Sequence, residues 1–226
     1  MIILLTVAIA PSLALFSYFY LRDQFAAEPS KLLFQSFIYG AVLTFPIMFI
    51  QYVFEFEGVF EQVFNQKVLF PSVLEEFFKW LVLIIAVYRH VDFEDPYDGI
   101  LYGASVSLGF ATVENVLYLM EFGLETAFIR AFLPVSSHAL FGVVMGYYLG
   151  RAKFTKGTNG PIWLAFAFVS SMSLHLIYNS ILYINTNLSY GVIPFMLFLW
   201  WFALRKVKQA HQLSLTHYHN NSSLHP

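Results

Sequence analysis

Seven polar residues that could take part in acid–base or metal chemistry interrupt the apolar stretches of this 226-residue chain. They are Glu75, Glu76, Lys79, Glu114, His138, His175 and Asn179. An ionisable side chain at the centre of a membrane-spanning helix costs about 2.5–3.5 kcal/mol on insertion scales, so such residues are functional candidates by default.

The residue types favour hydrolysis by an activated water molecule. The paired carboxylates of Glu75 and Glu76 can supply a general base, and a histidine can share that task. The amide of Asn179, or a second histidine such as His175, can donate a hydrogen bond to the oxyanion that forms when water attacks a carbonyl. The chain contains no G-x-S-x-G, no H-E-x-x-H and no cysteine, which excludes a standard zincin and a thiolate nucleophile.

Two versions of this hydrolysis fit the residues. A zinc ion could be held by His138, His175 and a glutamate from another helix, such as Glu114, with its fourth position open to water. A mechanism without metal, in which the carboxylates alone activate water, fits equally well. The sequence leaves the two open.

Structural roles compete with these functional ones. Ser72 and Glu75 have the spacing of a capping box, which would simply begin a helix. Glu75 and Lys79 form an i, i+4 pair whose charges can neutralise each other. Glu114 could hydrogen-bond a neighbouring helix, as could a single histidine in a helix.

The composition indicates an integral membrane protein. Apolar residues make up 58% of the chain and charged residues 12%, against about 25% charged in ordinary soluble domains. The mean hydropathy is +0.65. A net charge of −2 gives no basic field for nucleic acid, so the lipid bilayer is the expected environment.

Stretches of about twenty apolar residues match the ~30 Å hydrocarbon core of a bilayer. We predict an all-α polytopic transmembrane bundle of about seven spans. They are Ile2–Leu21, Leu33–Phe54, Ser72–Tyr88, Gly99–Met120, Arg130–Gly150, Ile162–Ile184 and Tyr190–Ala203. Residues 1–208 should form a single membrane-embedded domain, and residues 209–226, which are polar, a disordered cytoplasmic tail.

The basic residues predict the orientation. With the N-terminus outside and the C-terminus inside, nine Lys and Arg residues fall in inner loops and only Lys67 and Arg130 in outer ones. The acidic run Asp92–Asp98 then lies in an inner loop, where we expect a solvated turn that caps the fourth helix. The polar groups of the third to sixth spans all fall in the outer half of the bilayer.

Spacing places these groups on single helix faces. Ser171, His175 and Asn179 recur at i, i+4 and i+8. His138 begins a ladder with Gly142, Gly146 and Gly150, and small residues at this spacing let a neighbouring helix approach closely. Such close approach would bring groups from four helices into one pocket.

Four motifs in order resemble those of the PrsW family of bacterial membrane proteases, which is distantly similar to the CAAX prenyl-protease and bacteriocin-immunity group. Glu75 to Lys79 reads E-E-x-x-K, Phe110 to Glu114 reads F-x-x-x-E, and His175 to Asn179 reads H-x-x-x-N. His138 completes the set. The likeness covers nearly the whole chain apart from the tail and the loop at residues 62–67.

The resemblance implies a function. A PrsW-like protein would sit in the bacterial cell membrane and make the first, extracytoplasmic cut in a single-pass anti-sigma factor, so that an envelope-stress sigma factor is released. By analogy with the CAAX group, Glu75 or Glu76 with Glu114 would activate water. His175 and Asn179 would stabilise the oxyanion, and His138 would assist or bind metal.

The residues are also compatible with two other classes of membrane protein. An ion-coupled transporter also needs buried carboxylates and histidines, but it would usually show an inverted repeat and a polar path to both faces. A non-catalytic membrane sensor would keep the fold but tolerate the loss of one carboxylate. The complete motif set favours the protease.

Overall fold

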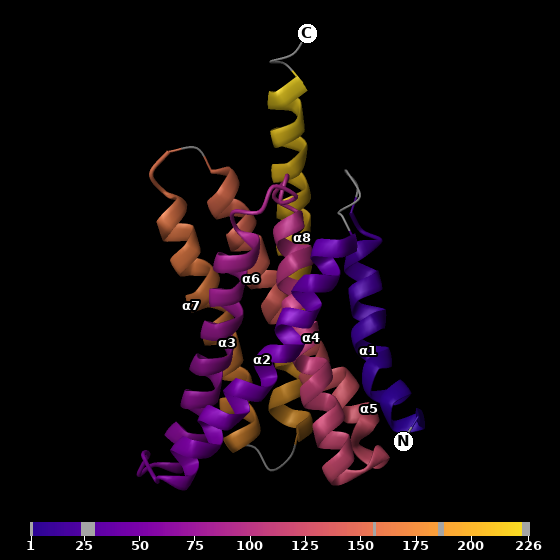
Figure 1. Ribbon diagram of the computed structural model, residues 1–226, viewed down its shortest axis with the longest axis vertical. Coiled ribbons are helices and arrows are strands. Elements are labelled where there is room, and N and C mark those ends of the chain that lie inside the picture. The colour runs from indigo at the N-terminus through magenta and orange to yellow at the C-terminus, as the bar shows by residue number, and fades with distance from the viewer. Residues whose placement is uncertain (1, 24–29, 156, 185–187, 223–226) are drawn as a thin grey trace.

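The computed structural model describes residues 2–23, 30–155, 157–184 and 188–222. These residues are overwhelmingly helical and include no β-strand, which confirms the all-α prediction. Within these ranges the helices join into seven continuous stretches, and successive stretches run in alternating directions (Figure 1). The N-terminal end of α1 and the C-terminal end of α8 therefore lie at opposite ends of the bundle.

Apart from the end of α8, the helices begin and end close to the predicted spans. They are α1 (Ile2–Tyr20), α2 (Ser30–Phe56), α3 (Phe70–Val82), α4 (Asp98–Phe122), α5 (Ala127–Arg130), α6 (Ser136–Phe154), α7 (Gly160–Ile184) and α8 (Leu188–Ser222). Short π-helical turns extend α3 at both ends, η1 (Asn65–Leu69) and η2 (Leu83–Val87). A 3₁₀ turn, η3 (Leu124–Thr126), then α5 and the π turn η4 (Ala131–Val135), lead without a break into α6.

Five of the described helices are long and apolar enough to cross a membrane, which fits a multi-pass membrane protein. They are α1, α2 from Lys31, α4, the stretch Phe132–Phe154 and α7. The α3 helix, which carries Glu75, Glu76 and Lys79, and α8, whose apolar first part runs into several basic residues, are not among these five. Seven spans with the N-terminus outside therefore stay a prediction.

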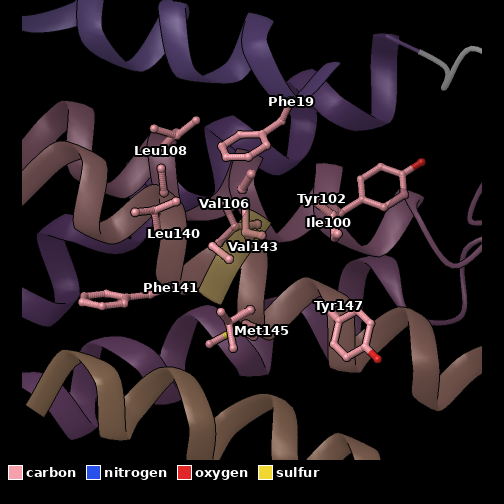
Figure 2. Close-up of a cluster of buried hydrophobic side chains, with 14 of the residues drawn as sticks. Phe19, Ile100, Tyr102, Val106, Leu108, Leu140, Phe141, Val143, Met145 and Tyr147 are labelled. Carbon is pink, nitrogen blue, oxygen red and sulfur yellow. The ribbon is translucent and has the colours of Figure 1, made fainter. Parts of the chain in front are cut away.

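The α4 and α6 helices form the centre of the bundle. Nearly every described residue of α4 up to Thr112, and of α6 up to Tyr147, is buried. The α4 helix packs on α6, α2 and α1, while α6 also packs on α7 and α8. Figure 2 shows Val106 and Leu108 of α4 meeting Leu140 and Val143 of α6, with Phe19 of α1 beside them.

The predicted glycine ladder is where α4 and α6 touch. A Cβ atom at Gly142 would collide with the Gly103 carbonyl oxygen, and one at Gly146 with the Gly99 carbonyl oxygen. In the same way, a Cβ atom at Gly99 or Gly103 of α4 would collide with the backbone of α6. The two backbones are thus in direct contact, which only residues without a side chain allow.

The C-terminal segment differs from the prediction of a disordered tail over residues 209–226. The α8 helix continues through Ser222, and residues 223–226 lie outside the described part of the chain. The physical reason is a buried stripe at helical spacing that does not stop at the apolar stretch. It consists of Val192, Met196, Leu199, Ala203, Val207, Ala210 and Ser214.

The acidic turn before α4 is likewise less solvated than predicted, because Asp95 and Asp98 are each only 1% exposed. The Asp98 Oδ2 atom accepts the backbone N–H groups of Glu94 and Asp95 at 2.8 and 2.6 Å. The Ser214 hydroxyl of α8 donates to Asp95 Oδ1 at 2.7 Å. The turn therefore serves as the docking point for the end of α8.

Candidate active site

The α3 helix presents Glu75, Glu76 and Lys79 to the interior of the bundle, where all three are buried. The alternative of a capping box at Ser72 is excluded, because helical structure already begins at Asn65. The Ser72 hydroxyl instead donates to the Val68 carbonyl oxygen one turn earlier, at 2.7 Å. Glu75 is therefore an interior helical residue rather than a helix start.

Lys79 lies at the centre of the polar cluster and is completely buried. Its Nζ atom donates to Glu76 Oε1 at 2.8 Å and lies 3.1 Å from His138 Nδ1. Glu75 Oε2 is farther away, at 3.7 Å. The ammonium group also sits 4.2 Å from the centre of the Phe110 ring, a cation–π contact.

Each histidine has its own carboxylate partner. His175 Nδ1 lies 3.1 Å from Glu76 Oε1, and His138 Nε2 lies 3.2 Å from Glu114 Oε2. An ammonium group can only donate hydrogen bonds, so His138 Nδ1 must be the accepting nitrogen and its Nε2–H faces Glu114. A carboxylate on the outer nitrogen is the arrangement that orients metal-binding histidines in many proteins.

Among the residues that the structure describes, Glu75, His138 and His175 form a group that could hold one metal ion. All three are buried, and one ligand atom from each lies within 4.8 Å of the other two. Glu114, the glutamate that the sequence suggests as a third ligand beside the two histidines, contacts His138 from outside in the structure, and Glu75 takes its place among the ligand atoms.

The donor set fits zinc in a catalytic site. Two imidazoles and one carboxylate leave a fourth position open, as catalytic zinc sites require. Ligand atoms around tetrahedral zinc are about 3.5 Å apart, so the three groups would have to draw together by about 1 Å. Glu75 Oε2 supports the fit, because this buried oxygen has no hydrogen-bond partner among the described residues.

The structure adds Gln51, a residue that the sequence motifs do not include. Gln51 of α2 donates from Nε2 to Glu75 Oε1 at 3.2 Å and so holds the oxygen that does not face Lys79. A glutamine within the apolar run of α2 was the available signal, although Gln35 earlier in the same helix gives the same signal. Nothing in the spacing along one helix could reveal its partner on another.

Asn179 joins the cluster at its edge. Its Nδ2 atom donates to the Ser72 hydroxyl oxygen at 3.0 Å, which ties α7 to α3. One amide N–H of Asn179 is used in this bond, and the other remains for a further acceptor. Phe141, one turn after His138, stacks on the His175 ring with centres 5.1 Å apart.

Two of the polar groups, Glu76 and His138, lie farther from the ends of their helical stretches than predicted. The helical stretches that carry Glu76 and His138 begin at Asn65 and Leu124, upstream of the predicted starts at Ser72 and Arg130. Counted from these ends, Glu76 is about 16 Å and His138 about 21 Å along the helix. Their placement in the outer half of a bilayer stays a prediction.

Comparison with known proteins agrees with the motifs. The model of the PrsW family of intramembrane metalloproteases matches residues 28–204. Protease PrsW of Bacillus subtilis (strain 168) is 51% identical over 95% of this chain and 99% of its own length. Protease PrsW of Geobacillus kaustophilus is 50% identical over 92% of each, and that of Clostridioides difficile 29% identical over 91% and 90%. No solved structure matches the chain.

These matches cover the helices that carry every residue of the cluster. They decide for a protease over the ion-coupled transporter and the sensor. The chain belongs to the PrsW family of intramembrane metalloproteases and is a multi-pass membrane protease.

Proposed function

We propose that this protease uses one metal ion, held by Glu75, His138 and His175, to make the first extracytoplasmic cut in a single-pass anti-sigma factor. The observation that carries the proposal is the meeting of these three side chains from α3, α6 and α7 in one buried cluster. A zinc ion bound there would polarise the scissile carbonyl or a water molecule as a Lewis acid. Without metal, the Oε2 atom of Glu75 makes no hydrogen bond to the described residues and has only the Lys79 ammonium group nearby, at 3.7 Å.

Glu114 is the best placed general base. Its side chain is 35% exposed, whereas Glu76 is fully buried between Lys79 and His175. As water attacks the carbonyl carbon, Glu114 accepts its proton, and it returns this proton to the amide nitrogen when the C–N bond breaks. This assigns Glu114 the water-activating role that the CAAX analogy gave it together with Glu75 or Glu76.

Asn179 serves as the oxyanion donor. An amide cannot act as a base, and a hydrogen bond aimed at developing negative charge contributes about 2.7–4 kcal/mol to catalysis. The Ser72 hydroxyl fixes the amide plane of Asn179, so the donor is oriented before substrate arrives. His175, which the CAAX analogy also assigned to the oxyanion, acts as a metal ligand in this scheme, with Glu76 on its other nitrogen.

The substrate and the membrane sidedness rest on the family resemblance and on the charge bias of the loops. Residues 1–208 form the membrane-embedded protease domain in the bacterial plasma membrane, with the N-terminus outside. The cut in the anti-sigma factor prepares it for a second intramembrane protease. Release of the sigma factor then starts the envelope-stress response.

Reconstitution tests this function. The purified protein and a membrane-spanning anti-sigma factor from the same organism are placed together in liposomes, and the product is sequenced from its new N-terminus. We expect one cut in the extracytoplasmic segment, abolished by a chelator and restored by zinc.

Glu75→Gln, His138→Ala and His175→Ala should each abolish that cut, with Glu121→Gln and His90→Ala as controls outside the cluster. Cleavage on the cytoplasmic side would contradict the proposed role. Cleavage that persists in all three site variants would contradict the assigned site.

A further inference from the structure

We infer that the ammonium group of Lys79 occupies the metal centre when no metal is bound. It must leave His138 when the ion binds, and Lys79 therefore lowers the affinity of the site for metal. The inference rests on the proposed metal centre of Glu75, His138 and His175. Lys79 is neither one of the proposed metal ligands nor a participant in the proposed catalytic steps.

The contacts of Lys79 are those of a bound cation. Its Nζ atom lies between Glu76 Oε1 at 2.8 Å, His138 Nδ1 at 3.1 Å and Glu75 Oε2 at 3.7 Å. Two of these three neighbours are residues of the proposed ligand set. The aromatic face of Phe110 closes the remaining side at 4.2 Å.

Metal binding and the Lys79–His138 hydrogen bond exclude each other. A neutral imidazole has one nitrogen lone pair, and the ammonium group of Lys79 uses it at Nδ1. An ion that binds Nδ1 must displace the ammonium directly. An ion that binds Nε2 requires the ring proton to move to Nδ1, which can then no longer accept from Lys79. Either way the contact breaks.

The displaced ammonium has a place to remain. Glu76 lies three residues before Lys79 on α3 and accepts its shorter hydrogen bond. Glu76 is also the partner of His175 Nδ1, so it stays charged and paired while the centre fills. Displacing the ammonium group therefore requires only a change of rotamer in the Lys79 side chain.

Charge repulsion acts in the same direction as the competition for His138. A single positive charge a few ångströms from a divalent ion weakens binding of that ion, strongly so in a buried site. Removing the charge should therefore tighten zinc binding even though it removes a residue of the E-E-x-x-K motif. A purely structural lysine would give the opposite result, because its loss would disorder the ligands.

Equilibrium zinc titration of the full-length protein in detergent, against a competing fluorescent chelator, tests the inference. We expect Lys79→Met to bind zinc at least tenfold more tightly than wild type. Its metal-free form should melt at a lower temperature, because Glu76 and Glu75 then lack their cation. Lys153→Met, the same change at the far end of α6, should leave the affinity unchanged.

A second variant covers the case in which Lys79→Met does not fold. Glu76→Gln combined with Lys79→Met removes the closer of the two charges that Lys79 pairs with and leaves only Glu75, whose Oε2 atom lies 3.7 Å from Lys79, without its cation; it is compared with Glu76→Gln alone. We expect the same tenfold gain. Equal or weaker zinc binding by the folded lysine variants, while wild type binds zinc, would overturn the role of Lys79 alone. Absence of zinc binding from wild type and every variant would overturn the metal centre itself.

Discussion

The three carboxylates of the cluster have different surroundings, and these surroundings separate their roles. Glu76 is completely buried and shared between Lys79 and His175. Glu75 is held by Gln51 through one oxygen and leaves the other without a hydrogen bond. Glu114 is the most exposed of the three. A buried, paired group suits orientation, and an accessible one suits proton transfer.

Glu114→Gln should separate catalysis from metal binding. The amide keeps the size of the side chain but cannot accept the proton of the attacking water. We expect kcat to fall about 10²–10⁴-fold, the range for loss of a general base, with zinc content unchanged. Initial rates in liposomes and the zinc content of the same preparation give the two values. A variant that loses its zinc but cleaves normally when zinc is in excess would contradict this assignment.

At the scale of single residues, the sequence predicted which residue types form the site and how they are spaced within one helix. Glu75, Glu76, Glu114, His138, His175 and Asn179 were all singled out, and the structure brings them together. Their pairing could not be predicted, because distances between helices depend on how the bundle packs. For that reason Glu114 was placed among the metal ligands and Gln51 was not noticed.

At the scale of elements, α4 and α6 form the rigid frame of the site. Glu114 and His138 come from these two helices, and their contact depends on backbones that touch at Gly103 and Gly142. The stripe of glycines was visible in the sequence. The partner helix was not, although the matching glycines of α4 were the available signal.

Gly142→Leu should separate the two helices and so break the site from a distance. The new side chain would collide with the Gly103 carbonyl oxygen and Ser107. Overpacking of this kind costs about 1–3 kcal/mol of stability. We expect a lower melting temperature and loss of bound zinc, measured on the purified protein. Ala165→Leu, on an exposed face of α7, is the matched control. Normal zinc content in a stably folded Gly142→Leu protein would contradict the account.

The end of α8 forms a second contact between elements. His211 stacks on Tyr97 with ring centres 4.3 Å apart, and its Nε2–H donates to the Arg22 carbonyl oxygen at 2.8 Å. Burial lowers the pKa of His211 below its ordinary value of 6.5, although the Arg22 contact and the nearby Asp23 act in the other direction. The docked state therefore favours the neutral ring.

The docking of α8 should weaken in acid. A histidine whose pKa is lower in the folded state contributes stability that is complete above pH 6.5 and is lost as the pH falls through the lowered pKa. We expect the melting temperature to drop between pH 7.5 and 5.5 more in wild type than in His211→Gln. His219→Gln, at an exposed position of the same helix, should keep the wild-type difference. Identical pH profiles for wild type and His211→Gln would exclude this role.

Hydropathy predicted most helix boundaries closely. The end of α8 and the start of α3 were predicted wrongly for a physical reason. Polar residues on the outer faces of α8 conceal a buried stripe of small residues such as Ala210 and Ser214. A hydropathy window averages all faces of a helix, so it ends α8 at Ala203. The start of α3 was missed for the same reason, since residues 65–69 are helical but polar in part.

At the scale of the whole molecule, alternating helix directions bring the C-terminal ends of α2, η2, α4 and α6 to alternating ends of the bundle (Figure 1), and residues 59, 91, 121 and 158 lie at or within a few residues of these ends in the sequence. The chain contains no cysteine, so single cysteines can report the side of the membrane on which each loop lies. With the N-terminus outside, Val59→Cys and Glu121→Cys should react with an impermeant maleimide on intact cells. Val91→Cys and Thr158→Cys should react only after permeabilisation. The reverse pattern would contradict the orientation.

The central claim is that Glu75, His138 and His175, from three different helices, bind one metal ion. Metal analysis of purified wild type and single variants, by mass spectrometry with protein quantified in the same sample, tests it most directly. The account predicts about one zinc per chain in wild type, in Glu114→Gln and in the His90→Ala control, and almost none in Glu75→Gln, His138→Ala and His175→Ala. Wild-type zinc content in all three of those variants would contradict it.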